Sequence, residues 1–153
     1  MTYVDVMEAI AVKIAALWPK RMLYRDFCPA DHKRPSSFLY VRHAGYTDAA
    51  IGLVQWSFSA ELELHASTDS YSVESTEALR ADQAAVLAQF GGPSLAVGDR
   101  HIHVETAAET PGPGAAYVSF TASWMDARPG YTDPEAQTPE TGGAPLMEHF
   151  EIE

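Results

Sequence analysis

Residues 53–66, LVQWSFSAELELHA, alternate apolar and polar side chains without a break. Successive side chains of a β-strand point to opposite faces of its sheet, so this alternation predicts one long strand. Its dry face carries Val54, Trp56, Phe58, Ala60, Leu62 and Leu64, and its wet face carries Gln55, Ser57, Ser59, Glu61, Glu63 and His65. Such a strand belongs to a sheet with one covered and one solvated face, which constrains the rest of the fold.

Two other segments have the apolar spacing of helices. Residues 2–18 begin with Thr2 and Asp5, which fit a capping box, and Pro19 ends this helix because proline lacks the N–H donor. Residues 73–90 predict a second helix, with acidic residues in its first turns and two glycines after its end. The apolar stripes are Val6, Ile10, Ile14 and Leu17 in the first helix, and Leu79, Val86 and Phe90 in the second.

Four shorter strands are predicted, at residues 21–27, 38–44, 100–106 and 116–127. A proline-containing loop occupies 28–37, and a turn-like stretch, GYTDAAIG, occupies 45–52. The expected order is therefore helix, three strands, helix and two strands. This order predicts an α+β sandwich, in which an antiparallel sheet of about five strands carries both helices on one face.

The chain divides into one predicted domain and a tail. Residues 1–128 are expected to form the α+β domain, since 153 residues suffice for one core and are too few for two comfortable ones. Residues 129–153 are rich in proline, glycine and acidic residues and are expected to form an extended C-terminal tail. Within this tail, residues 147–152 alternate enough between apolar and polar to predict a short edge strand. The sheet of a neighbouring subunit is one candidate partner for that strand.

Charge is distributed unevenly along the chain. Residues 1–48 carry seven basic and five acidic residues, whereas the rest carries three basic and sixteen acidic residues. Nucleic-acid affinity comes mainly from Lys and Arg, so specific binding to DNA or RNA is not expected. The sequence has no apolar run of about 20 residues that would span a bilayer, and its single cysteine, Cys28, suits a reducing compartment. We therefore expect a soluble protein made in the cytoplasm.

The stretch DRHIHVET, residues 99–106, raises the possibility of a metal site. On a single strand, His101, His103 and Glu105 would share one face. The spacing resembles the first metal-binding motif of the cupins, but Leu95 stands where that motif has glycine, and alanines stand where it has glutamate. The second cupin motif needs asparagine, which this chain lacks altogether. A solvated strand face is the better interpretation, and no metal or other cofactor is expected.

Other catalytic patterns are equally weak. Cys28 and His32 could pair a thiol with a base, but they are close sequence neighbours, which seldom form such pairs. GPSLA, residues 92–96, approaches a nucleophile elbow but lies after a helix instead of before one. No enzyme is therefore predicted. A small metal-dependent or thiol enzyme that uses His101, His103 or Cys28 remains the alternative from another class.

Several short stretches together resemble the tail terminator family of tailed bacteriophages, in the form found in phages and prophages of Gram-positive hosts. The opening MTYVDVMEAIAVKIAALWP is similar to the family's short first helix and its stop. Leu23, Tyr24 and Asp26 match the family's first strand, and the strand 53–66 matches its long strand. The start of the family's second strand is matched by Lys33, Arg34, Pro35, Phe38 and Leu39. The resemblance covers residues 1–127. The family is often rich in lysine and asparagine, whereas this chain is rich in alanine and lacks asparagine.

The resemblance implies a structural virion protein. Members form a ring, usually a hexamer, on the head-proximal end of the tail tube, where they stop polymerisation and dock head-completion or connector proteins. The expected partners are therefore further copies of this chain, the tail tube protein and a head-side protein. Interface residues are expected in the basic stretch, in 45–52 and in the tail, namely Lys33, Arg34, Arg42, Tyr46, Asp48 and Phe150. Another tube, neck or head–tail joining protein of similar fold is the runner-up.

Overall fold

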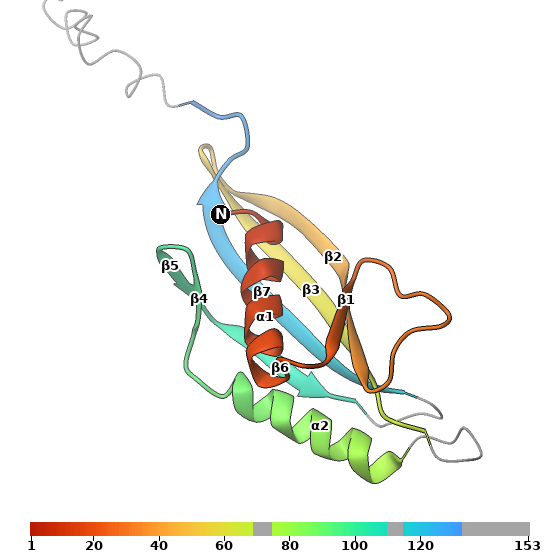
Figure 1. Ribbon diagram of the computed structural model, residues 1–153. Coiled ribbons are helices and arrows are strands. Elements are labelled where there is room, and N and C mark those ends of the chain that lie inside the picture. Colours follow the sequence, from red (N-terminus) through yellow and green to blue (C-terminus); the bar gives the residue numbers. More distant parts are fainter. Residues whose placement is uncertain (69–74, 110–114, 133–153) are drawn as a thin grey trace, which may run out of the picture.

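The computed structural model describes residues 1–68, 75–109 and 115–132. Two helices and a five-stranded sheet form an α+β fold, as predicted (Figure 1). The elements are α1 (Tyr3–Leu17), β1 (Met22–Arg25), β2 (Ser36–Ala50), β3 (Leu53–His65), α2 (Thr76–Gln89), β4 (Leu95–Val97), β5 (Arg100–Ile102), β6 (Val104–Ala108) and β7 (Ala116–Ala127). The predicted edge strand at 147–152 and Phe150 lie outside the described residues.

The main sheet has the strand order β1-β2-β3-β7-β6, and β4 pairs with β5 in a separate hairpin. Neighbours in the main sheet are antiparallel except β1 and β2, which run parallel with Met22 opposite Ser36. The sheet is thus mixed, and the prediction of a wholly antiparallel sheet was wrong at this edge. Loop 26–35 causes the difference. It carries the chain from the end of β1 back to the level of Met22, so β2 runs in the same direction as β1.

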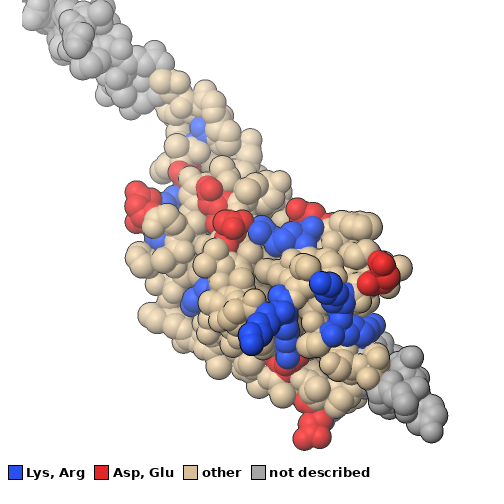
Figure 2. Space-filling view, in the orientation of Figure 1, with Lys and Arg blue, Asp and Glu red and all other residues tan. Residues whose placement is uncertain are grey.

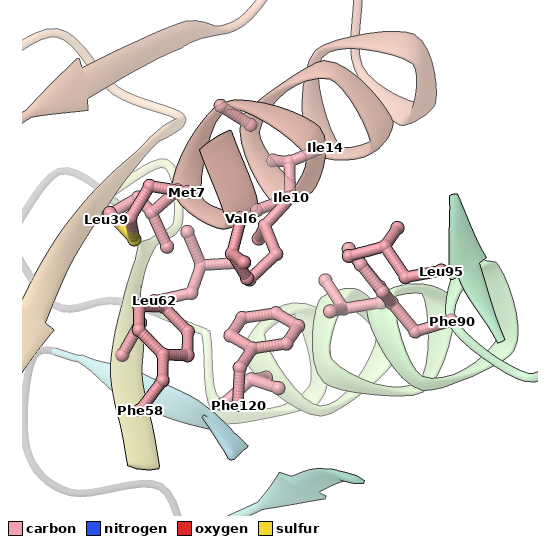
Figure 3. Packing of buried hydrophobic residues seen from close by; sticks show 14 of the residues in the cluster. Val6, Met7, Ile10, Ile14, Leu39, Phe58, Leu62, Phe90, Leu95 and Phe120 are labelled. Carbon is pink, nitrogen blue, oxygen red and sulfur yellow. The ribbon is translucent and has the colours of Figure 1, made fainter. Parts of the chain in front are cut away.

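The helices and the dry face of the sheet enclose one core. Val6, Ile10 and Ile14 of α1 meet Leu62 of β3 and Phe120 of β7, and all five are almost completely buried (Figure 3). Leu79 and Val86 of α2 extend the same cluster. The burial of alternate residues along β3 therefore confirms its predicted dry face. Burial of each such side chain stabilises the fold by roughly 1.5–3 kcal/mol.

Helix α1 begins and ends where its sequence indicates. The Thr2 hydroxyl accepts a hydrogen bond from the Asp5 N–H at 3.3 Å, and the Asp5 carboxylate accepts one from the Thr2 N–H at 2.7 Å. This reciprocal capping box satisfies donors that the first helical turn leaves free. Helix α2 begins at Thr76, later than predicted, because the Ser75 hydroxyl caps it by accepting from the Ala78 N–H.

The predicted turn at 45–52 is mostly strand. β2 continues to Ala50, and only Ile51 and Gly52 connect it to β3. Glycine and aspartate suggested a turn, but pairing with the long, regular β3 supplies hydrogen-bond partners that override this local preference. The result is a long β2–β3 hairpin, whose end lies beside the end of β7 (Figure 1).

The predicted strand at 100–106 is divided between two sheets. Arg100–Ile102 pairs with β4, a strand that was not predicted, whereas Val104–Ala108 pairs with β7 at the edge of the main sheet. His103 lies between the two strands. Apolar and polar residues still alternate across this break, so the sequence pattern alone does not reveal it.

Candidate functional site

The predicted interface residues lie toward opposite ends of β2. Lys33 and Arg34 precede its first residue, whereas Tyr46 and Asp48 lie near its last. At about 3.3 Å per residue, Ser36 and Tyr46 within this strand are separated by roughly 30 Å. The structure therefore divides the predicted residues between two surfaces, with Arg42 between them. Phe150 lies outside the described residues.

The basic stretch is largely engaged within the subunit. Arg42 forms a salt bridge with Glu61, and Arg34 Nη1 donates to the Ala66 carbonyl at 3.3 Å. Lys33 donates its backbone N–H to the Tyr24 hydroxyl at 2.8 Å. Figure 2 shows several basic side chains gathered on the side of the molecule that carries α1 and β1. Arg34 and Arg42 thus hold the subunit's own structure together.

Arg42 reaches Glu61 through an irregularity in β2. Val41 pairs with Ala60 and His43 with Ser59, so Arg42 is an extra residue opposite the regular β3. This β-bulge reverses the alternation that follows it. Tyr46 consequently lies on the helix-covered side of the sheet, directly opposite Trp56.

The end of the β2–β3 hairpin exposes large apolar side chains. We call Ile51, Leu53 and Met125 the hairpin end; all three are exposed, and Ile51 is 80% exposed. Leu53 and Met125 lie on the side of the sheet opposite the helices, because they alternate with the buried Val54 and Trp124. Leu53 and Met125 are brought near one another by the pairing of β3 with β7. Clustered apolar side chains on a soluble protein's surface mark a contact site, because water leaves them unfavourably exposed.

The hairpin end is held rigidly. Arg128 forms a salt bridge with Asp48 at 2.7 Å and donates hydrogen bonds to the carbonyls of Ile51 and Ala50 at 2.9 and 3.2 Å. Gly52 allows Tyr131 to pack closely, since a Cβ there would lie 2.9 Å from the Tyr131 ring. A preorganised surface loses little conformational entropy when a partner binds it.

An aromatic row supports the hairpin from the helix-covered side. Tyr46 and Trp56 have ring centroids 4.9 Å apart, and Trp56 stacks on Trp124 at 6.0 Å. Trp124 is buried and also contacts Phe58 of the core at 6.3 Å. The row therefore connects the exposed Tyr46 to the hydrophobic core through rigid rings.

A second apolar surface lies beside α1. A groove of about 710 Å³ runs between α1 and the β4–β5 hairpin. Its lining residues are Met1, Asp5, Glu8, Ala9, Val12, Lys13, Leu95, Ala96, Val97, Gly98, Asp99 and Arg100. Val12 is 59% exposed although its side chain is wholly apolar, and Val4 is exposed two helical turns before it. We call this surface the α1 groove.

The face of the sheet opposite the core carries small polar side chains. Ser57 pairs with Ser123, and Ser59 pairs with Thr121, so hydroxyl groups form adjacent rows across β3 and β7. Glu105 of β6 continues one row. Among the described residues, no helix covers these rows, and we call them the open sheet face.

At one end, the predicted wet face of β3 is covered. Glu61 is 4% exposed and His65 is 5% exposed, although both alternate with core residues and were expected in water. Loop 26–35 accounts for part of this cover, since its His32 ring lies 4.2 Å from that of His65 between centroids. The prediction was wrong here because an alternating pattern cannot show that a loop folds across the polar side.

Burial shifts the pKa values of this covered group. Burial lowers the pKa of His65 to about 4, with His32 and Arg34 adding to the effect. Burial and the neighbouring Glu61 raise the pKa of Tyr40 to about 12. Burial, with Glu63 nearby, also raises the pKa of the Cys28 thiol. A nucleophilic cysteine needs the opposite shift, so this environment does not favour a thiol enzyme.

The histidines of 99–106 are not arranged as expected. His101 lies on β5, His103 follows it, and Glu105 lies on β6 of the other sheet, so the three do not share one strand face. His101 Nδ1 lies 3.4 Å from the Ser94 hydroxyl, and His103 Nδ1 lies 3.5 Å from the Pro93 carbonyl. In the described part of the chain, no three His, Cys, Asp or Glu side chains are grouped to hold a metal ion.

Sequence reasoning overlooked Leu53, Met125 and Val12, and it included Ile51 only as part of the range 45–52. Ile51 was one letter of an apparent turn, and Leu53 and Met125 lay within strands whose exposed ends were not recognised. Val12 carries a signal of its own, because it lies outside the predicted apolar stripe of α1 and yet is apolar.

None of the described helices is long and apolar enough to cross a membrane.

Comparison with models of known protein families and with curated proteins found no match to this chain.

Proposed function

We propose that this chain is a tail terminator that closes into a ring, of six subunits as the sequence resemblance implies, at the head-proximal end of a phage tail tube. The observation that carries the proposal is the hairpin end, where Ile51, Leu53 and Met125 form a rigid, exposed apolar surface. Contact between copies of the chain would remove it from water. Residues 45–52, which the sequence suggested as interface material, supply one of its members, Ile51.

Two further observations support an assembly role. The α1 groove is a separate apolar surface on the same chain, and a ring requires two different surfaces that meet between neighbouring copies. The α+β fold with both helices on one face of the sheet also agrees with what the resemblance implied.

The open sheet face suits the lining of a DNA passage. Ser57, Ser59, Thr121 and Ser123 offer hydroxyls, and Glu105 adds negative charge. Arg42 lies on the same side, where it is paired with Glu61. A phosphate backbone binds chiefly to Lys and Arg, so a lining of this kind would let DNA slide without holding it. We therefore propose that this face lines the channel of the ring.

Two measurements test the proposed function. Light scattering over a range of protein concentration and salt should give one discrete mass, about 100 kDa for six chains of 16.7 kDa. Electron microscopy of tail tubes assembled with the protein should show tubes that stop growing, each with a ring at one end. Unlimited polymers of the chain itself would indicate a tube protein instead, and tubes that grow on unchanged would contradict the proposal.

A further inference from the structure

We infer that the hairpin end of one subunit docks into the α1 groove of a second copy of the chain. The inference deepens the proposed function, because it rests on ring formation and names the two surfaces that form the ring contact. It begins from two exposed apolar surfaces of one chain that have matching chemistry.

The groove has the size and lining to receive side chains. Its volume of about 710 Å³ lies within the range of roughly 300–1,000 Å³ typical of sites that bury a bound molecule. Ala9 and Val12 form its α1 side, and Leu95, Ala96 and Val97 form its β4 side. Ile51 and Leu53 are apolar side chains of the kind that such a lining would remove from water.

Most charged groups around both surfaces already have partners; among the described residues, Asp99 of the groove is the exception. At the groove, Glu8 pairs with Arg25, and Arg100 pairs with Asp126. Lys13 donates to the Gln89 carbonyl and lies over the Phe90 ring. Asp48, at the hairpin, pairs with Arg128. Docking would therefore leave few of these charges without a partner. The main penalty when charged surfaces lose water is the burial of an unpaired charge.

The occupant must come from another copy. The pairing of β2 with β3 continues to Ala50 and Leu53, so the hairpin cannot fold back without breaking the sheet. Arg128 further fixes its tip through Ile51 and Asp48. Because the hairpin end and the groove are different surfaces, their contact is heterologous, and repetition of one such contact generates a ring when the rotation between neighbouring copies closes.

Two charge-introducing variants and their mixture test the inference. Ile51→Lys places an ammonium group at the hairpin end, and Val12→Lys places one in the groove. Val12→Lys also gains a favourable helix neighbour in Glu8, four residues earlier. Phe27→Lys and Leu87→Lys make the same change at exposed apolar residues outside both surfaces and serve as matched controls. Circular dichroism and thermal melting verify folding, and analytical ultracentrifugation measures mass.

Each interface variant alone should associate at least about tenfold more weakly than wild type, because a lysine is poorly accommodated in an apolar contact. An equimolar mixture should form a dimer of one chain of each kind and stop there. In that dimer, the intact hairpin end of the Val12→Lys chain meets the intact groove of the Ile51→Lys chain. Both controls should retain the wild-type mass.

Other outcomes would overturn the inference. If Val12→Lys keeps the wild-type mass, the groove takes no part in assembly. If Ile51→Lys keeps the wild-type mass while Val12→Lys does not, another segment, such as residues 147–152, fills the groove. Association of Val12→Lys alone would indicate contact between two hairpin ends. A monomeric wild-type chain would also overturn it, whereas the proposed function is judged separately by termination of tail tubes.

Discussion

The imidazole of His65 lies 4.2 Å from that of His32 between ring centroids, and the two rings are inclined by 39°. His65 is on β3 and His32 is in loop 26–35, so the pair joins the loop to the polar side of the sheet. Neither ring nitrogen of His65 forms a hydrogen bond with any described residue, although Nε2 lies 3.5 Å from a Glu63 carboxylate oxygen. The burial of His65 and its contact with a second imidazole disfavour a charged His65, and they outweigh the carboxylate of Glu63.

Stability should fall on acidification because of His65. Its folded pKa, about 4, is below the ordinary value of 6.5, so the unfolded chain binds the proton more readily. The contribution is fully present above pH 6.5 and is lost as the pH falls from about 6.5 toward 4, on the order of 2 kcal/mol. Urea unfolding between pH 7.5 and 4.5 measures this loss.

His65→Phe provides the comparison for that experiment. The raised pKa of Glu63, caused chiefly by its burial, works in the opposite direction, because its folded form keeps a proton to higher pH. Glu63 remains in the variant, so the difference between the two pH profiles isolates His65. Parallel profiles would contradict the role assigned to this histidine.

Removing Arg42 should destabilise the subunit. Glu61 is 4% exposed, and Arg42→Ala would leave its carboxylate buried without the guanidinium that binds it. We expect a clearly lower melting temperature for Arg42→Ala and substantial recovery in the double variant Arg42→Ala/Glu61→Leu. If the single variant melts like wild type, the salt bridge contributes nothing to stability.

Phe120→Ala should be among the most damaging changes in the core. The side chain is fully buried and packs edge-to-face on Phe90, with ring centroids 4.8 Å apart. Loss of the ring leaves a cavity as well as losing burial, which costs about 3–5 kcal/mol in the free energy of unfolding. Guanidinium unfolding measures the loss, with Phe120→Leu as a variant that should lose much less. Equal losses in the two variants would contradict this packing.

The basic stretch is best tested at Lys33. Charge reversal at Arg42 or Arg34 would disturb contacts inside the subunit, whereas Lys33 is exposed and bonds to Tyr24 through its backbone. If the stretch faces acidic groups of a neighbour or connector, Lys33→Glu should weaken assembly by less than about tenfold at low salt, and the effect should fade at high salt. An unchanged ring at low salt would exclude that contact.

Local sequence patterns determined the elements whose surroundings are simple. The alternation from Val54 to Leu64 specified β3 and its core face, and Thr2, Asp5 and Pro19 specified both ends of α1. These signals succeed because they depend on neighbours within a few residues: the pleat of a strand, the free N–H groups of a first turn and the missing donor of proline.

The surfaces that carry the proposed function were decided only by tertiary structure. Long-range pairing with β3 converted residues 45–50 from an expected turn into strand and thereby exposed Ile51 at a rigid tip. A loop that folds over β3 covers His65, and a change of sheet at His103 puts His101 and Glu105, which had seemed to share one strand face, in different sheets. Each outcome depends on contacts between residues far apart in the chain, and a local pattern cannot contain that information.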